Sequence, residues 1–175
     1  MNLYLVGLRG SGKSTVGRRV AGRLGLAFVD ADAEVEREAG RTVAELFAAE
    51  GEAGFRARER RVMLALAARS GLVVATGGGA VLDAGVRAAL AASGVVVWLD
   101  AAPEVRASRI AGDGGRPPLT EHGGGPAEER AVALAREPLY RSCAAVRLGT
   151  DDRTPEEVAG DVERVWRDLA GDDVR

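Results

Sequence analysis

Residues 7–14 read Gly7-Leu8-Arg9-Gly10-Ser11-Gly12-Lys13-Ser14 and match the pattern G-x-x-x-x-G-K-[ST] in full. The short apolar run Leu3–Val6 comes directly before this stretch, and the amphipathic stretch Lys13–Leu24 follows it. A strand, a glycine-rich turn and a helix in this order aim backbone N–H groups at one place, where the helix N-terminus adds partial positive charge. The stretch therefore predicts a P-loop, the phosphate-binding loop of an α/β fold.

Two side chains of this loop are expected to contact ATP or its metal ion directly. Lys13 is placed to reach the β- and γ-phosphates of ATP, and the Ser14 hydroxyl is suited to ligate Mg²⁺. The alternative is a glycine-rich turn without a ligand, which the strand–loop–helix setting disfavours. The residues that we expect to contact ATP here are Gly10, Ser11, Gly12, Lys13, Ser14 and Thr15.

Beyond the loop, short apolar runs alternate with helical stretches. Further strands are expected at Ala27–Val29, Leu72–Thr76, Val95–Leu99 and Ala145–Leu148. Helices are expected at Ala33–Ala39, Thr42–Ala49, Phe55–Arg69, Asp83–Ala92, Pro103–Ile110, Ala127–Ala144 and Pro155–Leu169. Strands that are apolar throughout are buried on both faces, so the pattern predicts an α/β fold, a three-layer αβα sandwich around a parallel sheet. With 175 residues, no repeat and no linker, we expect one domain over residues 1–175.

The composition disfavours several classes of protein. A net charge of −2 gives no overall field that would draw the chain to nucleic acid or to an anionic membrane. One cysteine, Cys143, allows neither an intramolecular disulfide nor a CxxC metal pair. No apolar run approaches the roughly 20 residues that span a bilayer, and no signal peptide is predicted. We expect a cytoplasmic monomer with no nucleic-acid or membrane partner.

Two carboxylates, Asp30 and Asp32, follow the second expected strand. They should emerge at the C-terminal edge of the sheet, where open α/β sheets bind their ligands. One of them is suited to approach Mg²⁺, and the other to accept a proton from the hydroxyl group of an acceptor. A helix N-cap is the simpler interpretation of a single aspartate here, but it leaves the second aspartate unexplained.

Two further groups of residues are expected near the same edge. Arg56 and Glu59 lie at i, i+3 after Phe55, either as a surface ion pair or with Glu59 holding Arg56 for an anionic substrate. Gly77–Gly79 end the third strand, either as a plain turn or as backbone that a ligand approaches closely. Residues 112–126 are rich in glycine and proline and carry Arg116 and His122. A loop of this length is typical of a lid that closes over a site.

Taken in order, these motifs resemble the shikimate kinase family. The set consists of the P-loop, Asp30-x-Asp32, Phe55-Arg56-x-x-Glu59, Gly77-Gly78-Gly79, Arg116-Pro117 and Arg136-x-x-Leu139-Tyr140, and it runs to about Pro155. The resemblance implies a five-stranded parallel sheet of order 2-3-1-4-5. It also implies a substrate-binding helical segment at about residues 31–62 and a lid at about residues 112–126, which is richer in glycine here than in the family's pattern.

The resemblance also implies an activity. ATP, with Mg²⁺, would phosphorylate the 3-hydroxyl of shikimate, a small cyclohexene carboxylate, giving shikimate 3-phosphate and ADP in aromatic amino acid biosynthesis. Asp32 would be the base, helped in catalysis by Lys13 and Arg116, and Ser14 and Asp30 would support Mg²⁺. The residues implied to bind shikimate are Asp32, Arg56, Gly77, Gly78, Gly79 and Arg136. Those implied to bind ATP beyond the P-loop are Arg109, Arg116 and Arg153.

Two other functions remain open from the sequence. A gluconate kinase also needs arginines for a carboxylate, although the Arg56–Glu59 pair and the three glycines favour shikimate. A nucleotide-dependent regulatory module would use ATP to order the lid for a protein partner. Such a module has no need for Asp32, Arg56, Gly78 and Arg136 to converge on one pocket.

Overall fold

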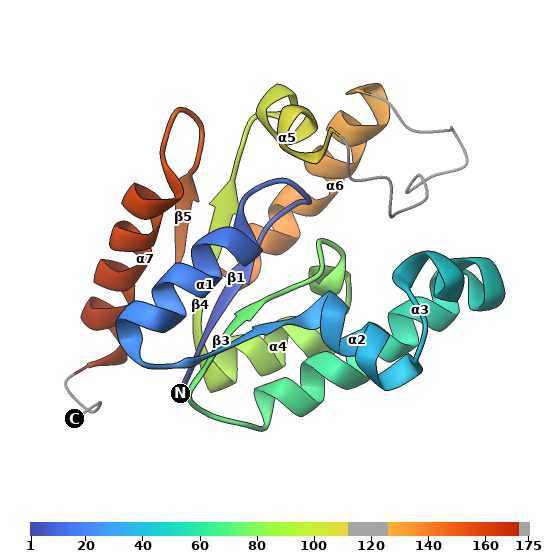
Figure 1. Ribbon diagram of the computed structural model, residues 1–175, viewed down its shortest axis with the longest axis horizontal. Helices are drawn as coiled ribbons and strands as arrows, with labels where there is room; N and C mark the ends of the chain where they lie inside the picture. The colour runs from blue at the N-terminus through green and yellow to red at the C-terminus, as the bar shows by residue number, and fades with distance from the viewer. Residues whose placement is uncertain (112–125, 172–175) are drawn as a thin grey trace.

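A computed structural model describes residues 1–111 and 126–171, and within these ranges the expected order of elements is confirmed (Figure 1). The strands are β1 Asn2–Val6, β2 Ala27–Asp30, β3 Leu72–Ala75, β4 Gly94–Asp100 and β5 Val146–Gly149. The helices are α1 Lys13–Leu24, α2 Ala31–Ala39, α3 Val43–Ala67, α4 Ala84–Ser93, α5 Pro103–Ile110, α6 Pro126–Cys143 and α7 Pro155–Ala170, with a 3-10 turn, η1, at Ala80–Leu82.

The five strands form one sheet in the order β2-β3-β1-β4-β5, and every neighbouring pair is parallel. This confirms the order that the family resemblance implies. From the central strand β1 the chain first builds outward through β2 and β3 and then crosses to β4 on the other side. Ligands of open α/β sheets bind where the direction reverses, so the fold directs them to the C-terminal end of β1.

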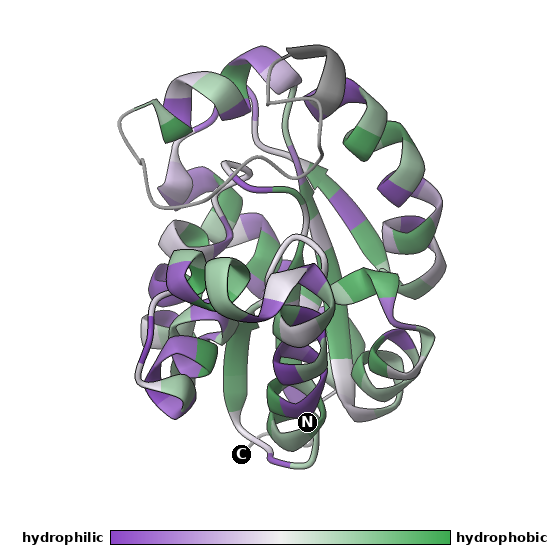
Figure 2. Ribbon diagram, turned by 90° about the vertical axis from the view of Figure 1, so that its right-hand side faces the viewer, coloured by the Kyte–Doolittle hydropathy of each residue, from purple (hydrophilic) through white to green (hydrophobic). Residues whose placement is uncertain are grey.

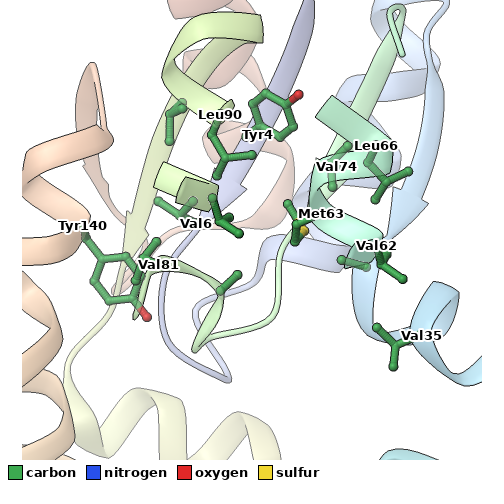
Figure 3. Packing of buried hydrophobic residues seen from close by; sticks show 14 of the residues in the cluster. Tyr4, Val6, Val35, Val62, Met63, Leu66, Val74, Val81, Leu90 and Tyr140 are labelled. Atoms are coloured by element: carbon green, nitrogen blue, oxygen red, sulfur yellow. The ribbon is translucent and has the colours of Figure 1, made fainter. Parts of the chain in front are cut away.

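Helices cover both faces of the sheet, which confirms the three-layer sandwich (Figure 1). Alternate side chains of β1 point to opposite faces. Leu3 and Leu5 pack with α1 and α7, whereas Tyr4 and Val6 belong to the core that α2, α3, α4 and α6 complete (Figure 3). The strands are coloured as largely hydrophobic in Figure 2, as expected for a sheet buried on both sides. In the described ranges, no helix combines the length and the apolar character needed to cross a membrane.

The segment from α2 to α3 differs in one respect from the sequence prediction. Helix α3 begins with a capping box at Thr42, in which Thr42 Oγ1 accepts from the Glu45 N–H and the Glu45 carboxylate accepts from the Thr42 N–H. The two helices predicted after it, however, run together as α3. Gly51 separates them with φ 69° and ψ −177°, a conformation that glycine adopts without a steric penalty. The break is thus a kink at Gly51 and not a loop.

A buried asparagine joins three elements at the N-terminal edge of the sheet. Asn2 has no exposed surface, and its Nδ2 donates to Tyr4 Oη at 2.9 Å and to the carbonyl of Arg69 at 2.8 Å. Its Oδ1 accepts from the N–H of Leu72 at 3.0 Å. The side chain therefore ties β1 to the chain after α3 and to the start of β3, at the edge opposite the expected ligand site.

We expect Asn2→Leu to lower the free energy of unfolding by about 3 kcal/mol, because a leucine of similar size would leave buried donors and acceptors without partners. Chemical denaturation measures this loss. Ser142→Ala, on the exposed side of α6, serves as the control and should change stability by less than about 0.5 kcal/mol. Equal stabilities of the Asn2→Leu variant and the parent would contradict the prediction.

Candidate active site

The P-loop connects β1 to α1 and has the geometry of an anion site. Gly7, Gly10 and Gly12 have φ values of 143°, 80° and 94°, which let the backbone curl. Helix α1 begins after Gly12 with no side-chain cap and no acidic residue in its first turn. Such a helix end presents its first N–H groups and its partial positive charge to a ligand.

Lys13 is folded into this loop. Its side chain is largely buried, with 8% of the residue exposed, and its Nζ donates to the carbonyl of Leu8 at 2.8 Å. The Ser11 N–H also donates to the carbonyl of Leu8, at 3.2 Å. The ammonium group is therefore fixed inside the curl of the loop, where the phosphates of a nucleotide would lie.

A cavity of about 830 Å³ opens beside the P-loop, a volume within the usual range for small-molecule sites. The loop residues expected to contact ATP, Gly10 to Thr15, all line it. It is also lined by predicted site residues from the ends of other elements, namely Asp30, Asp32, Gly78, Arg109 and Arg153. The structure thus brings these residues together from five separate stretches of the sequence.

Both carboxylate oxygens of Asp30 accept hydrogen bonds from neighbouring parts of the chain. Its Oδ1 accepts from the N–H groups of Asp32 at 3.1 Å and Ala33 at 3.4 Å, which makes it the N-cap of α2. Its Oδ2 accepts from the Ser14 hydroxyl at 2.6 Å. The N-cap interpretation is thus correct, but it leaves one carboxylate oxygen beside the P-loop.

The donor set at this point fits Mg²⁺. A hydroxyl and a carboxylate oxygen are hard ligands, and Mg²⁺ completes its octahedron with water and nucleotide phosphates. Within the described part of the chain, no three His, Cys, Asp or Glu side chains gather into a metal site. Ser14 and Asp30 would supply two ligands at most and leave the remaining positions of such a cation to water and nucleotide phosphates.

Asp32 and Glu59 meet at the end of β3. A Cβ atom added to Gly77 would collide with Glu59 Oε1 and would lie 2.8 Å from Asp32 Oδ1. Only 4% of the Glu59 side chain is exposed. Both carboxylates are therefore packed against the backbone of Gly77, and a side chain at this position would displace them.

Glu59 also pairs with Arg56, and the burial of the glutamate distinguishes this contact from a surface ion pair. Arg56 Nη1 donates to Glu59 Oε2 at 2.7 Å, and Glu52 accepts from the same guanidinium at 3.2 Å. Burial favours the neutral form of Arg56, but the two glutamates outweigh this effect and raise its pKa. A Cβ atom on Gly79 would collide with the guanidinium, so the arginine is pressed against the glycine turn.

Helix α6 contacts the same turn from another direction. Arg136, of which 7% is exposed, donates from Nη1 to the carbonyl of Gly78 at 3.0 Å. The Tyr140 hydroxyl, one helical turn further on, donates to the same oxygen at 2.6 Å. Neither Arg56 nor Arg136 lines the cavity; each contacts the glycine turn whose Gly78 does.

Of the three other predicted arginines, Arg109 and Arg153 lie within the described residues. Arg109 donates to Thr150 Oγ1 at 2.9 Å and to the Thr150 carbonyl at 2.7 Å, after the end of β5. Arg153 pairs with Asp161 of α7. Arg116 and His122 are outside the described residues.

Some cavity residues were missed in the sequence. Glu36 accepts from the N–H of Val43 at 2.8 Å, and both residues line the cavity, so this contact fixes the turn between α2 and α3 beside the site. Glu36 lies one helical turn after Asp32, and that spacing is a signal that could have found it. Thr150 directly follows the last strand and could have been found by its place at the sheet edge.

Comparison with known proteins shows which family this chain resembles. The family model described as "SKI: Shikimate kinase" matches residues 9–166. A shikimate kinase of Symbiobacterium thermophilum is 51% identical over 163 residues, 93% of this chain and 94% of the relative. One from Pseudomonas aeruginosa is 45% identical over 169 residues, 97% and 98% of the two chains.

Solved structures extend the comparison. Shikimate kinase from Acinetobacter baumannii, in complex with shikimate, superposes with a TM-score of 0.89 at 40% identity, covering 94% of this chain and 91% of the other. A gluconokinase from Sinorhizobium meliloti reaches a TM-score of 0.58 at 16% identity, which shows a shared fold alone. The chain therefore belongs to the shikimate kinase family and is an ATP-dependent kinase that acts on shikimate.

Proposed function

We propose that the cavity binds ATP and shikimate side by side and that the γ-phosphoryl group passes to the 3-hydroxyl of shikimate beside Asp32. The observation that carries this proposal is the meeting of two sets of residues in one place. The P-loop supplies a phosphate site on one side of the cavity, and Asp32 and Gly78 supply carboxylate and backbone on another. Phosphoryl transfer depends on positioning and charge neutralisation, which such a site provides.

On the nucleotide side, Gly10, Ser11, Gly12, Lys13, Ser14 and Thr15 hold the phosphates, and Arg109 and Arg153 flank the adenine. The open N-terminus of α1 and the buried ammonium of Lys13 support this assignment. Ser14 and Asp30 would hold Mg²⁺, which when bound neutralises charge that develops on the phosphates. Arg116 and the lid at about residues 112–126 belong to the same proposal on the family resemblance alone.

On the acceptor side, we assign the shikimate carboxylate to Arg56 and Arg136 and to the backbone of Gly77, Gly78 and Gly79. A planar guanidinium binds a carboxylate through two parallel hydrogen bonds. The raised pKa of Arg56 and its contact with Glu59 support an arginine that is charged and already held in place. The helical segment at about residues 31–62 would thus form the acceptor half of the site.

Asp32 is assigned as the base that accepts the proton of the 3-hydroxyl. It lines the cavity, and its neighbour Asp30 is already occupied by the N-terminus of α2 and by Ser14. Asp30 is thus assigned to the Mg²⁺ side of the site, and Asp32, which lines the cavity, to the acceptor side. The proposal also includes a cytoplasmic monomer without nucleic-acid partners, in keeping with the net charge of −2.

The choice of acceptor is tested by ADP release with shikimate, gluconate and nucleoside monophosphates offered separately. We expect turnover with shikimate and none above background with the others, because the pair of arginines and the glycine turn match a small ring carboxylate. Turnover with gluconate and none with shikimate would overturn the proposal. ADP release that no acceptor stimulates would favour the regulatory module.

We expect Asp32→Asn to lower kcat by roughly 100- to 10,000-fold, because the amide cannot take the hydroxyl proton. ATP affinity, measured by titration, should remain within about threefold, since the P-loop is untouched. Asp83→Asn is the control: Asp83 caps α4 away from the cavity, so this variant should keep its kcat. An Asp32→Asn variant with parental kcat would remove the base role from Asp32.

We expect Arg56→Lys to raise KM for shikimate by about tenfold while KM for ATP stays the same, because an ammonium cannot reproduce the planar fork. Initial-rate kinetics with each substrate varied in turn gives both values. Arg58→Lys is a matched control two residues away, since Arg58 pairs with Glu50, whereas Arg56 pairs with Glu59 against the glycine turn. Equal KM values for the two variants would place Arg56 outside the acceptor site.

A further inference from the structure

One carbonyl oxygen of the glycine turn receives two hydrogen bonds from the same helix. The Tyr140 hydroxyl donates to the carbonyl of Gly78 at 2.6 Å, and Arg136 Nη1 donates to that oxygen at 3.0 Å. The two side chains are four residues apart on α6 and so lie on one face of the helix. The hydroxyl and the guanidinium therefore share an acceptor, so a hydroxyl that holds this oxygen in place also affects the orientation of the guanidinium.

The core fixes the position of the tyrosine. Tyr140 is 1% exposed, and its ring stacks on Trp98 of β4 with centroids 5.6 Å apart and planes at 22°. Figure 3 shows the ring beside Val81, at the edge of the buried cluster. Burial raises the pKa of Tyr140 to about 12, so the hydroxyl keeps its proton and remains a donor at physiological pH.

Gly78, whose carbonyl it holds, lies close to both the P-loop and Arg136. A Cβ atom on Gly78 would lie 3.6 Å from the nitrogen of Arg9 and from the oxygen of Gly7, both in the P-loop. It would also lie 3.8 Å from Arg136 Nη1. Since a peptide group is planar, a hydrogen bond that fixes the carbonyl also fixes the following N–H, that of Gly79.

We propose that Tyr140 is a positioning residue for the acceptor site, whose hydroxyl holds the Gly78 carbonyl so that Arg136 is oriented toward the substrate carboxylate. The ring provides the anchor in the core, and the hydroxyl transmits that position to the glycine turn. This inference rests on the proposed function, because it takes Arg136 as a carboxylate-binding residue.

The test is Tyr140→Phe, which keeps the ring and its stacking on Trp98 and removes the hydroxyl. We expect KM for shikimate to rise about tenfold, the usual effect of losing one buried hydrogen bond, and KM for ATP to stay within about twofold. Calorimetric titration of shikimate into the variant should show the same loss of affinity. An unchanged affinity for shikimate, or an equal loss for both substrates, would overturn the inference.

The chain offers a matched control, because its other tyrosine lies in the same core. Tyr4 is fully buried, and its hydroxyl contacts Ser93 Oγ at 2.7 Å and Asn2 Nδ2 at 2.9 Å. Figure 3 shows Tyr4 and Tyr140 well apart in the cluster. Both Tyr→Phe variants should melt at lower temperature than the parent, but Tyr4→Phe should keep its KM for shikimate. A similar rise in KM for both variants would mean that a loosened core, and not the position of Gly78, is responsible.

Arg136→Lys separates this inference from the proposal beneath it. If Arg136→Lys raises KM for shikimate and Tyr140→Phe does not, the inference alone is wrong. If Arg136→Lys leaves KM unchanged, the assigned carboxylate site is wrong and the inference falls with it. In the double variant, Tyr140→Phe should add less than about twofold to the effect of Arg136→Lys, because it acts through that arginine. Fully additive effects would exclude this route.

Discussion

The turn at Gly77–Gly79 carries no Cβ atoms, and charged groups from three helices meet there. Asp32 of α2 and Glu59 of α3 lie against Gly77, Arg56 lies against Gly79, and Arg136 of α6 bonds to Gly78. Any larger residue at the first or third position would occupy space already taken by these side chains. The proposed acceptor half of the site therefore depends on a backbone turn that leaves room for these side chains, more than on any single side chain.

The order of the strands brings this turn to the nucleotide. β3 lies directly beside β1, so the glycine turn after β3 and the P-loop after β1 leave the sheet side by side. Gly78 lies close enough that a side chain there would contact Arg9 and Gly7. Asp30 makes a second connection, since it caps α2 and accepts from Ser14 at the start of α1. In the proposed site, these contacts fix the phosphate-binding and acceptor-binding residues relative to one another, and phosphoryl transfer depends on such preorganisation.

The sequence predicted those features whose signals are local. Unbroken apolar runs gave the strands, the P-loop pattern gave the phosphate site, and the i, i+3 spacing gave the Arg56–Glu59 pair. Several contacts that it did not predict join residues far apart in the chain. Asn2 contacts the backbone near residue 70, and Tyr140 bonds to Gly78. A sequence pattern has no signal for such contacts, because they exist only once the sheet has formed. Resemblance to a family supplied the order of the strands, which local patterns left open.

The Arg56–Glu59 ion pair is better explained by the orientation that it gives to Arg56 than by a gain in the stability of the fold. Removing two charges from water is costly, and a well-packed apolar pair is often as stable or more so. Here Glu59 is almost fully buried while Arg56 keeps 21% of its side chain exposed. That asymmetry leaves the guanidinium able to contact an anion, and the hidden carboxylate restricts its orientation. A chain that needed only a stable α3 could replace both members of the pair with packed apolar side chains, so the ion pair agrees with the proposed role of Arg56 in holding the substrate carboxylate.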